Sequence, residues 1–243
     1  HTMTIAAGAV ALAAGNAVWY ATGRPWAAVP AWAAFLVLTI AGERLELTRF
    51  LPRSAVARAA FVAIAAAIVA GAVLAADARG ARAFGAALLA LSLWLAANDL
   101  ARRTVRDRGL TRYTAVCLLS GYVWLAAAGA TIAVAGLDPG TAAYDAALHA
   151  LFLGFVFAMV FGHAPIIFPA VLRVKVPYAA SMYAPLALLH ASVALRLLGD
   201  ATASMPVLRA GAIANGVALA VFIVTMIAAV VRGRRGAPRP TAG

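Results

Sequence analysis

Long apolar stretches separated by short polar connections dominate the chain. Eight of them are long enough to cross a hydrocarbon core about 30 Å thick, which takes about 20 helical residues. Glycine and proline mark most of the connections, and short connections make consecutive helices antiparallel neighbours. The pattern predicts an all-α bundle of about eight transmembrane helices. Their predicted limits are 3–21, 27–48, 55–76, 81–101, 112–136, 142–170, 178–198 and 207–231.

Composition favours a membrane protein over a soluble one. Of 243 residues, 65% are hydrophobic and only 12% are charged, and the charges cluster between the apolar stretches. A soluble helical protein would spread charge along the outer face of every helix. We therefore expect a single transmembrane domain over residues 1–231, followed by a basic, disordered tail over residues 232–243. Cys117 is the one cysteine, so an internal disulfide and a Cys-x-x-Cys metal site are excluded.

Basic residues are unevenly divided between the two sets of alternate connections. One set, together with the tail, carries fifteen arginines and lysines, whereas the other carries five. Because such residues accumulate in cytoplasmic loops, both termini are predicted to face the cytoplasm across a bacterial-type cytoplasmic membrane. The formal charge of +12 is then a topology signal that attracts membrane lipid, not nucleic acid, since no phosphate-binding loop or aromatic-interleaved basic face accompanies it. The larger set consists of Arg44, Arg49, Arg53, Arg58, Arg102, Arg103, Arg106, Arg108, Arg112, Arg173, Lys175, Arg232, Arg234, Arg235 and Arg239.

Two histidines in the sixth stretch are the first candidates for chemistry. His149 and His163 are fourteen residues apart, which in an unbroken α-helix returns to nearly the same face about 21 Å further along. An imidazole within a membrane needs a partner, a metal or a cofactor. After His163, Pro165 and Pro169 remove two backbone donors, so a kink or an unwound helix end is predicted there.

The predicted topology places His149 and His190 at similar depth in the outer half of the membrane, on consecutive antiparallel helices. Two imidazoles at matching depth are what axial ligation of haem iron requires, or part of a copper site. We therefore predict a b-type haem between His149 and His190, with Arg196 pairing with its propionates. The alternative is that each histidine only forms hydrogen bonds across the bundle, for example to Ser192, Asn215 or a backbone carbonyl.

A second polar cluster is predicted near the inner side of the membrane. Glu43 and Glu46 share one helix face at this level, and Asn98 and Asp99 end the fourth stretch there. The cluster would serve as a second metal site or as a proton relay. Alternatively, the glutamates pair with Arg44 and Arg49 and only cap the bundle. The predicted members are His163, Glu43, Glu46, Arg44 and Asn98.

The segment from His149 to Ala170, HALFLGFVFAMVFGHAPIIFPA, resembles bacterial NnrS-like membrane proteins. Those proteins are associated with haem and copper and are linked to nitric oxide and denitrification. The segment is also distantly similar to the catalytic subunit of haem-copper oxidases, in which histidines on helices carry haem and copper. The resemblance lies mainly over residues 144–200. It implies one haem, or one haem and a further metal ion such as copper.

These patterns predict a haem-binding membrane protein with a redox or gas-handling role, such as nitric oxide handling or electron transfer. Whether it is a haem-dependent oxidoreductase stays open. Its expected partners are membrane lipid and a redox partner or gaseous ligand, and a homo-oligomer is not excluded. Two other functions remain open: a proton- or metal-ion transporter or channel that uses the intramembrane histidines and glutamates, and a non-catalytic membrane subunit.

Overall fold

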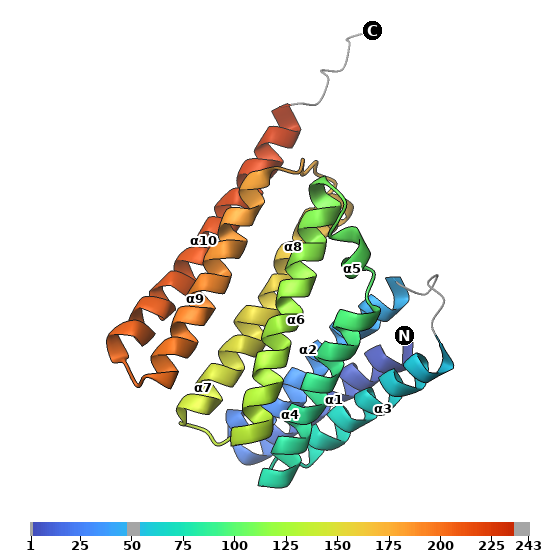
Figure 1. Cartoon of the computed structure of the whole chain (residues 1–243), viewed down its shortest axis with the longest axis vertical. Coiled ribbons are helices and arrows are strands. Elements are labelled where there is room, and N and C mark those ends of the chain that lie inside the picture. The colour runs from blue at the N-terminus through green and yellow to red at the C-terminus, as the bar shows by residue number, and fades with distance from the viewer. Residues whose placement is uncertain (1, 48–53, 236–243) are drawn as a thin grey trace.

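The computed structural model describes residues 2–47 and 54–235, which are helical and include no strand. Eight helical units in this part of the chain are long and apolar enough to cross a membrane, as the apolar stretches predict. The multi-pass helical bundle is therefore confirmed (Figure 1). The spans are α1 (Thr2–Thr22), α2 (Pro25–Leu47), α3 (Ala55–Val73), α4 (Ala78–Asn98), α6 (Gly109–Ala135), the unit from Ala142 to Leu172, α9 (Tyr183–Ala201) and α10 (Met205–Arg235).

The connections between spans contain two short helices, α5 (Ala101–Thr104) and the 3-10 helix η2 (Ala180–Met182). The last helix is longer than predicted, because α10 continues to Arg235 and thus includes the first four residues of the expected tail. The remainder of the tail, with Arg239, lies outside the described residues, as do Arg49 and Arg53.

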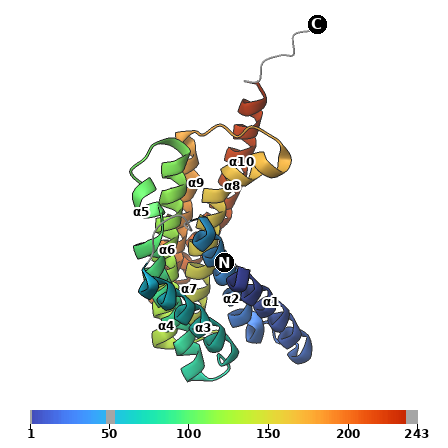
Figure 2. The same cartoon turned by 90° about the vertical axis from the view of Figure 1, so that its right-hand side faces the viewer.

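Consecutive helices pack in pairs, α1 with α2, α3 with α4 and α9 with α10, while α6 packs against α4. Figures 1 and 2 show the α9–α10 hairpin on one side of α6 and the α1–α2 hairpin leaning away on the other. Small residues allow these close approaches. A Cβ on Gly71 would lie 2.7 Å from the Cα of Phe84, and one on Gly85 would lie 2.4 Å from the backbone nitrogen of Ala133.

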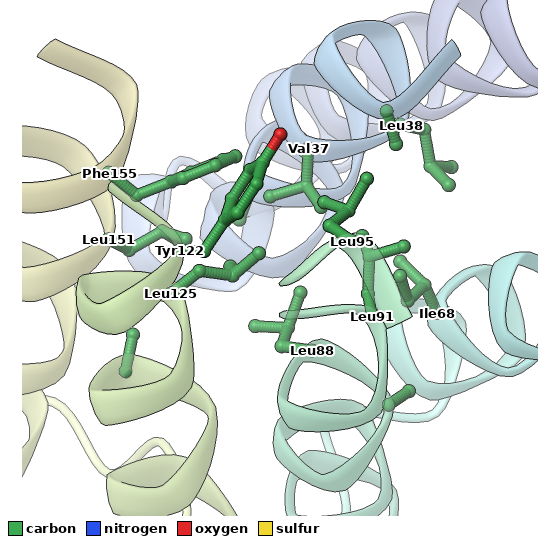
Figure 3. Close-up of a cluster of buried hydrophobic side chains, with 14 of the residues drawn as sticks. Val37, Leu38, Ile68, Leu88, Leu91, Leu95, Tyr122, Leu125, Leu151 and Phe155 are labelled. Carbon is green, nitrogen blue, oxygen red and sulfur yellow. The ribbon is translucent and has the colours of Figure 1, made fainter. Parts of the chain in front are cut away.

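Two clusters of buried side chains share α6. The first joins α2, α3, α4, α6 and the middle of the sixth span, and Figure 3 shows Tyr122 within it, near Phe155 and Leu125. The second joins α6 to α8, α9 and α10, where the rings of Phe161 and Phe222 stack with centroids 3.8 Å apart. The central position of α6 means that its polar residues meet both halves of the bundle.

The sixth span is not one continuous α-helix. It consists of α7 (Ala142–His149), the π-helix η1 (Ala150–Val156) and α8 (Phe157–Leu172). The helix is not unwound around Pro165 and Pro169, since both prolines lie inside α8, whereas the predicted kink there stays a prediction. The irregular segment comes earlier, directly after His149. Because a π-helix has wider turns than an α-helix, the argument that His149 and His163 share one face fails.

Candidate functional site

His149 ends α7 and is held by the residue one turn before it. Its Nδ1 lies 2.7 Å from the backbone oxygen of Asp145 and 3.3 Å from Oδ2 of the same residue. Both neighbours are acceptors, so Nδ1 carries a proton and donates it. The geometry thus leaves Nε2, the second ring nitrogen of His149, without a hydrogen-bond partner in the described part of the chain, where it could serve as a ligand.

Asp145 also joins α7 to α9 through Arg196. The guanidinium donates from Nε to Oδ2 at 3.0 Å and from Nη2 to Oδ1 at 3.2 Å. Pairing of Arg196 with haem propionates stays a prediction, and the partner that the structure gives this arginine is a carboxylate of the protein. Asp145 is half-buried and was not selected from the sequence, although its spacing of four residues from His149 on one helix is a usable signal.

Asp200, at the end of α9, extends this group. Its carboxyl group lies near enough to that of Asp145 for the two charges to act on each other, while its Oδ2 is buried and has no hydrogen-bond partner in the described part of the chain. Two carboxyl groups in contact do not both ionise readily unless a cation compensates them. Arg196 supplies one positive charge to this group, which consists of Asp145, Asp200, Arg196 and His149.

His190 on α9 contacts α6 through both ring nitrogens. Nε1 of Trp124 donates to Nδ1 at 2.9 Å, and Nε2 lies 2.9 Å from Oγ of Ser120. An indole N–H can only donate, so Nδ1 accepts and Nε2 carries the proton. To bind iron through Nε2, His190 would have to give up both hydrogen bonds. Its role as a haem ligand stays a prediction.

The alternative of a hydrogen-bonded histidine has direct support at His190, with other partners than those expected. Ser192 donates to Asn215 and not to the imidazole. Trp124 in turn depends on the π-helix, because a Cβ on Gly154 would lie 2.4 Å from its Cγ. Gly154 therefore provides the space in which Trp124 reaches His190.

His163 lies about two turns beyond the π-helix, on α8. Its Nδ1 donates to the backbone oxygen of Met159 at 2.7 Å, so Nδ1 carries a proton here as well. The imidazole is near enough to Arg44, Asp99 and Glu43 for their charges to act on it. His149 and His163 therefore have different neighbours, α9 for the first and the ends of α2 and α4 that carry Arg44 and Asp99 for the second.

Arg44 and Asp99 form the centre of the inner polar cluster. Nε of Arg44 donates to Oδ2 of Asp99 at 2.8 Å, and Nη2 donates to Oδ1 at 2.9 Å. Asp99 also accepts from the hydroxyl of Tyr122 at 2.7 Å and from the backbone nitrogen of Ala101 at 2.8 Å. Burial by itself would raise the pKa of Asp99, but these donors and the charge of Arg44 hold that pKa below its usual range.

The other predicted members of the inner cluster are less central. Glu43 is exposed and Glu46 is half-buried, while Asn98 donates to the backbone oxygen of Trp94 in its own helix. Sequence reasoning placed Asp99 at this level but did not find its pairing with Arg44, and it missed Tyr122. No sequence spacing indicates those contacts, since they join three separate spans.

No group of three or more histidine, cysteine, aspartate or glutamate residues that could hold a metal ion occurs within residues 2–47 and 54–235. A haem iron needs one or two protein ligands, because the porphyrin supplies the rest. The available nitrogens are therefore Nε2 of His149 and Nε2 of His163, each without a hydrogen-bond partner among the described residues.

The model of one protein family, described as a domain of unknown function (DUF8744), matches residues 1–231. The chain belongs to the DUF8744 family. No curated protein and no solved structure matches the chain. The DUF8744 match includes both histidine sites, the inner cluster and all but the last few residues of α10.

Proposed function

We propose that this protein binds a b-type haem within the membrane through His149 and takes part in redox or gas chemistry. The observation that supports this most is the state of the His149 ring, with Nδ1 held by Asp145 and Nε2 unengaged. Histidines that bind metals usually donate their other ring N–H to a carbonyl or carboxylate in this way. The π-helix that follows adds support, because such segments are frequent at functional sites.

The hydrogen bonds of His190 favour a gas-handling role over simple electron transfer. His190 is held by Trp124 and Ser120, so His149 would be the histidine that holds the haem, and the haem would supply a site for a small ligand such as nitric oxide. If His190 gave up its hydrogen bonds with Trp124 and Ser120, it would hold the haem together with His149. A haem bound in that way suits electron transfer.

Absorption spectra of the purified full chain, expressed with adequate haem, test the proposal. We expect a haem band in the reduced-minus-oxidised spectrum, and we expect His149→Ala to abolish it. His163→Ala is the matched control, because His163 lies in the same span and has the same hydrogen bond to a carbonyl four residues back. Haem content should survive in that control. Absence of any haem band in the wild-type protein would overturn the proposal.

The same spectra separate the two coordination states. If His190 does not bind the iron, His190→Ala keeps its haem, and the wild-type protein binds carbon monoxide without a change in protein ligand. Loss of haem in both His149→Ala and His190→Ala would support the two-histidine arrangement that the sequence predicts.

A second candidate is proton translocation, which the position of the ionisable groups favours. Asp145, Asp200 and His149 lie at one end of the sixth and seventh spans, and His163 lies near Arg44 and Asp99 at the other. Ionisable groups inside a membrane frequently belong to proton relays. A colourless protein that moves protons across liposomes, and loses this flux in Asp145→Asn, would support this function instead of haem binding.

A further inference from the structure

A pocket of about 220 Å³ lies beside Arg44, where α2, the α4–α6 connection, α6 and α8 meet. It is separate from His149 and His190. Its polar lining comes from Arg44 and from three threonines, among them Thr111 and Thr114. Binding sites for whole drug-sized ligands are usually about 300–1,000 Å³, so this pocket suits the polar end of a larger molecule.

Arg44 gives the pocket a fixed positive group. The residue is only 7% exposed, and its two hydrogen bonds with Asp99 hold the guanidinium plane in place. Arg44 lines the pocket, and Asp99 does not. A preorganised guanidinium is a strong partner for phosphate oxygens.

Residues of α6 contribute further hydrogen-bond donors to the pocket. Thr111 lies in the first turn of this 27-residue helix, whose start has no side-chain cap. The first N–H groups of a helix have no partner within it, and they favour a negative charge. The hydroxyl of Thr114 is already engaged, since it donates to the backbone oxygen of Gly162 at 3.0 Å. Thr111 thus supplies the hydroxyl that can turn to an incoming anion.

The surroundings of the pocket match an amphiphile with a negative head group. Residues 100–112 carry five arginines and one aspartate, which makes this end of the bundle strongly basic. The pocket walls include Leu118 and Ile166, and Ile166 is 48% exposed on the outer surface of α8. A head group inside the pocket would therefore continue into a chain that lies along an apolar helix surface.

We propose that this pocket binds the phosphate head group of an anionic membrane phospholipid, with an acyl chain beside Ile166. The phosphate accepts hydrogen bonds from Arg44, from the Thr111 hydroxyl and from the first turn of α6. Binding at this site holds the inner ends of α2, α6 and α8 together. The site does not depend on haem, so it can be tested in the full chain whether or not haem is bound.

Native mass spectrometry of the full chain, with added phosphatidylglycerol or phosphatidylcholine, tests the site. We expect one tightly retained phosphatidylglycerol and weaker retention of phosphatidylcholine. Thr111→Glu places a carboxylate at the start of α6, where it interacts favourably with the first N–H groups of the helix and repels the phosphate. Retention of phosphatidylglycerol should then fall by roughly tenfold or more, as expected for the loss of a charge-assisted contact.

Met205→Glu is the matched control, because Met205 is exposed in the first turn of α10 and does not line the pocket. It changes the net charge equally and should retain the lipid. Should Thr111→Glu fail to fold, Thr111→Val removes only the hydroxyl and is expected to weaken retention on the order of threefold. Equal retention of both lipids, or an unchanged affinity in the Thr111 variants, would overturn the proposal. Inorganic phosphate that binds as tightly as the lipid would also overturn it, in favour of a free-phosphate site.

Discussion

The guanidinium of Arg44 donates two hydrogen bonds to the carboxylate of Asp99, which lies 55 positions further along the chain. Both residues are less than a tenth exposed. The pair ties the end of α2 to the connection after α4, and Tyr122 extends it to α6. Arg44 also lines the pocket that contains Thr111, and His163 lies near enough for the charges of Arg44 and Asp99 to act on it.

Removal of one partner of this pair should destabilise the protein strongly. In Asp99→Asn, Arg44 keeps its buried charge but loses its ionic partner, and such changes cost about 3–5 kcal/mol. Chemical unfolding in detergent, followed by circular dichroism, measures the loss. Glu43→Gln is the control, because Glu43 is exposed beside Arg44 and its replacement should change stability by less than about 0.5 kcal/mol. Equal stability of the two variants would contradict a structural role for the pair.

The Asp99 carboxylate also predicts how the free energy of unfolding depends on pH. The pKa of Asp99 is lower in the folded protein than in the unfolded chain, where a carboxyl titrates near about 3.9. The folded state therefore gains stability from Asp99 above this pH and loses it as the pH falls through the lower native pKa. Unfolding measured from pH 7 downward should show a loss of stability below about pH 4. In Asp99→Asn the loss of stability at acid pH should be smaller. An identical loss in both proteins would rule out Asp99 as its source.

Gly154 in the π-helix should not tolerate a side chain. A Cβ there lies 2.4 Å from Cγ and 2.6 Å from Cβ of Trp124, and neither atom can move without shifting the indole from His190. We expect Gly154→Ala to cost about 1–3 kcal/mol and to change tryptophan fluorescence. Gly216→Ala on α10 provides the comparison, because its new Cβ meets no atom within 4 Å. That variant should be neutral or up to about 1 kcal/mol more stable.

In the group around Asp145, a second substitution should restore the stability that a first one removes. Arg196→Gln removes the positive charge that compensates Asp145 and Asp200, so the contact between the two carboxyl groups becomes repulsive. We expect a lower unfolding temperature in this variant than in the wild-type protein. Adding Asp200→Asn removes one of the two charges and should restore most of the loss. Arg209→Gln, which replaces an exposed arginine on α10, should leave the unfolding temperature unchanged.

Much of the architecture follows from the sequence because it depends on local properties. A stretch of about 20 apolar residues has to form a helix in a membrane, whatever its neighbours are, since its backbone groups have no other partners there. The eight spans and the helix ends marked by glycine and proline were therefore predictable to within a few residues. The presence of His149 and His163 in one span followed in the same way.

The tertiary structure decided which polar groups meet. Asp99 accepts hydrogen bonds from Arg44 and Tyr122. His190 forms hydrogen bonds with Trp124 and Ser120, and each of these contacts joins parts of the chain that are distant in sequence. No periodicity encodes such contacts, because they depend on how the helices rotate and cross. The π-helix after His149 was also not predictable from the sequence. It packs against α6, α9 and α2, and it changes the phase of the sixth span. The prolines of α8 do not indicate this change. The sequence by itself determined where the chain crosses the membrane, and only the packing of the spans determined which side chains share a site.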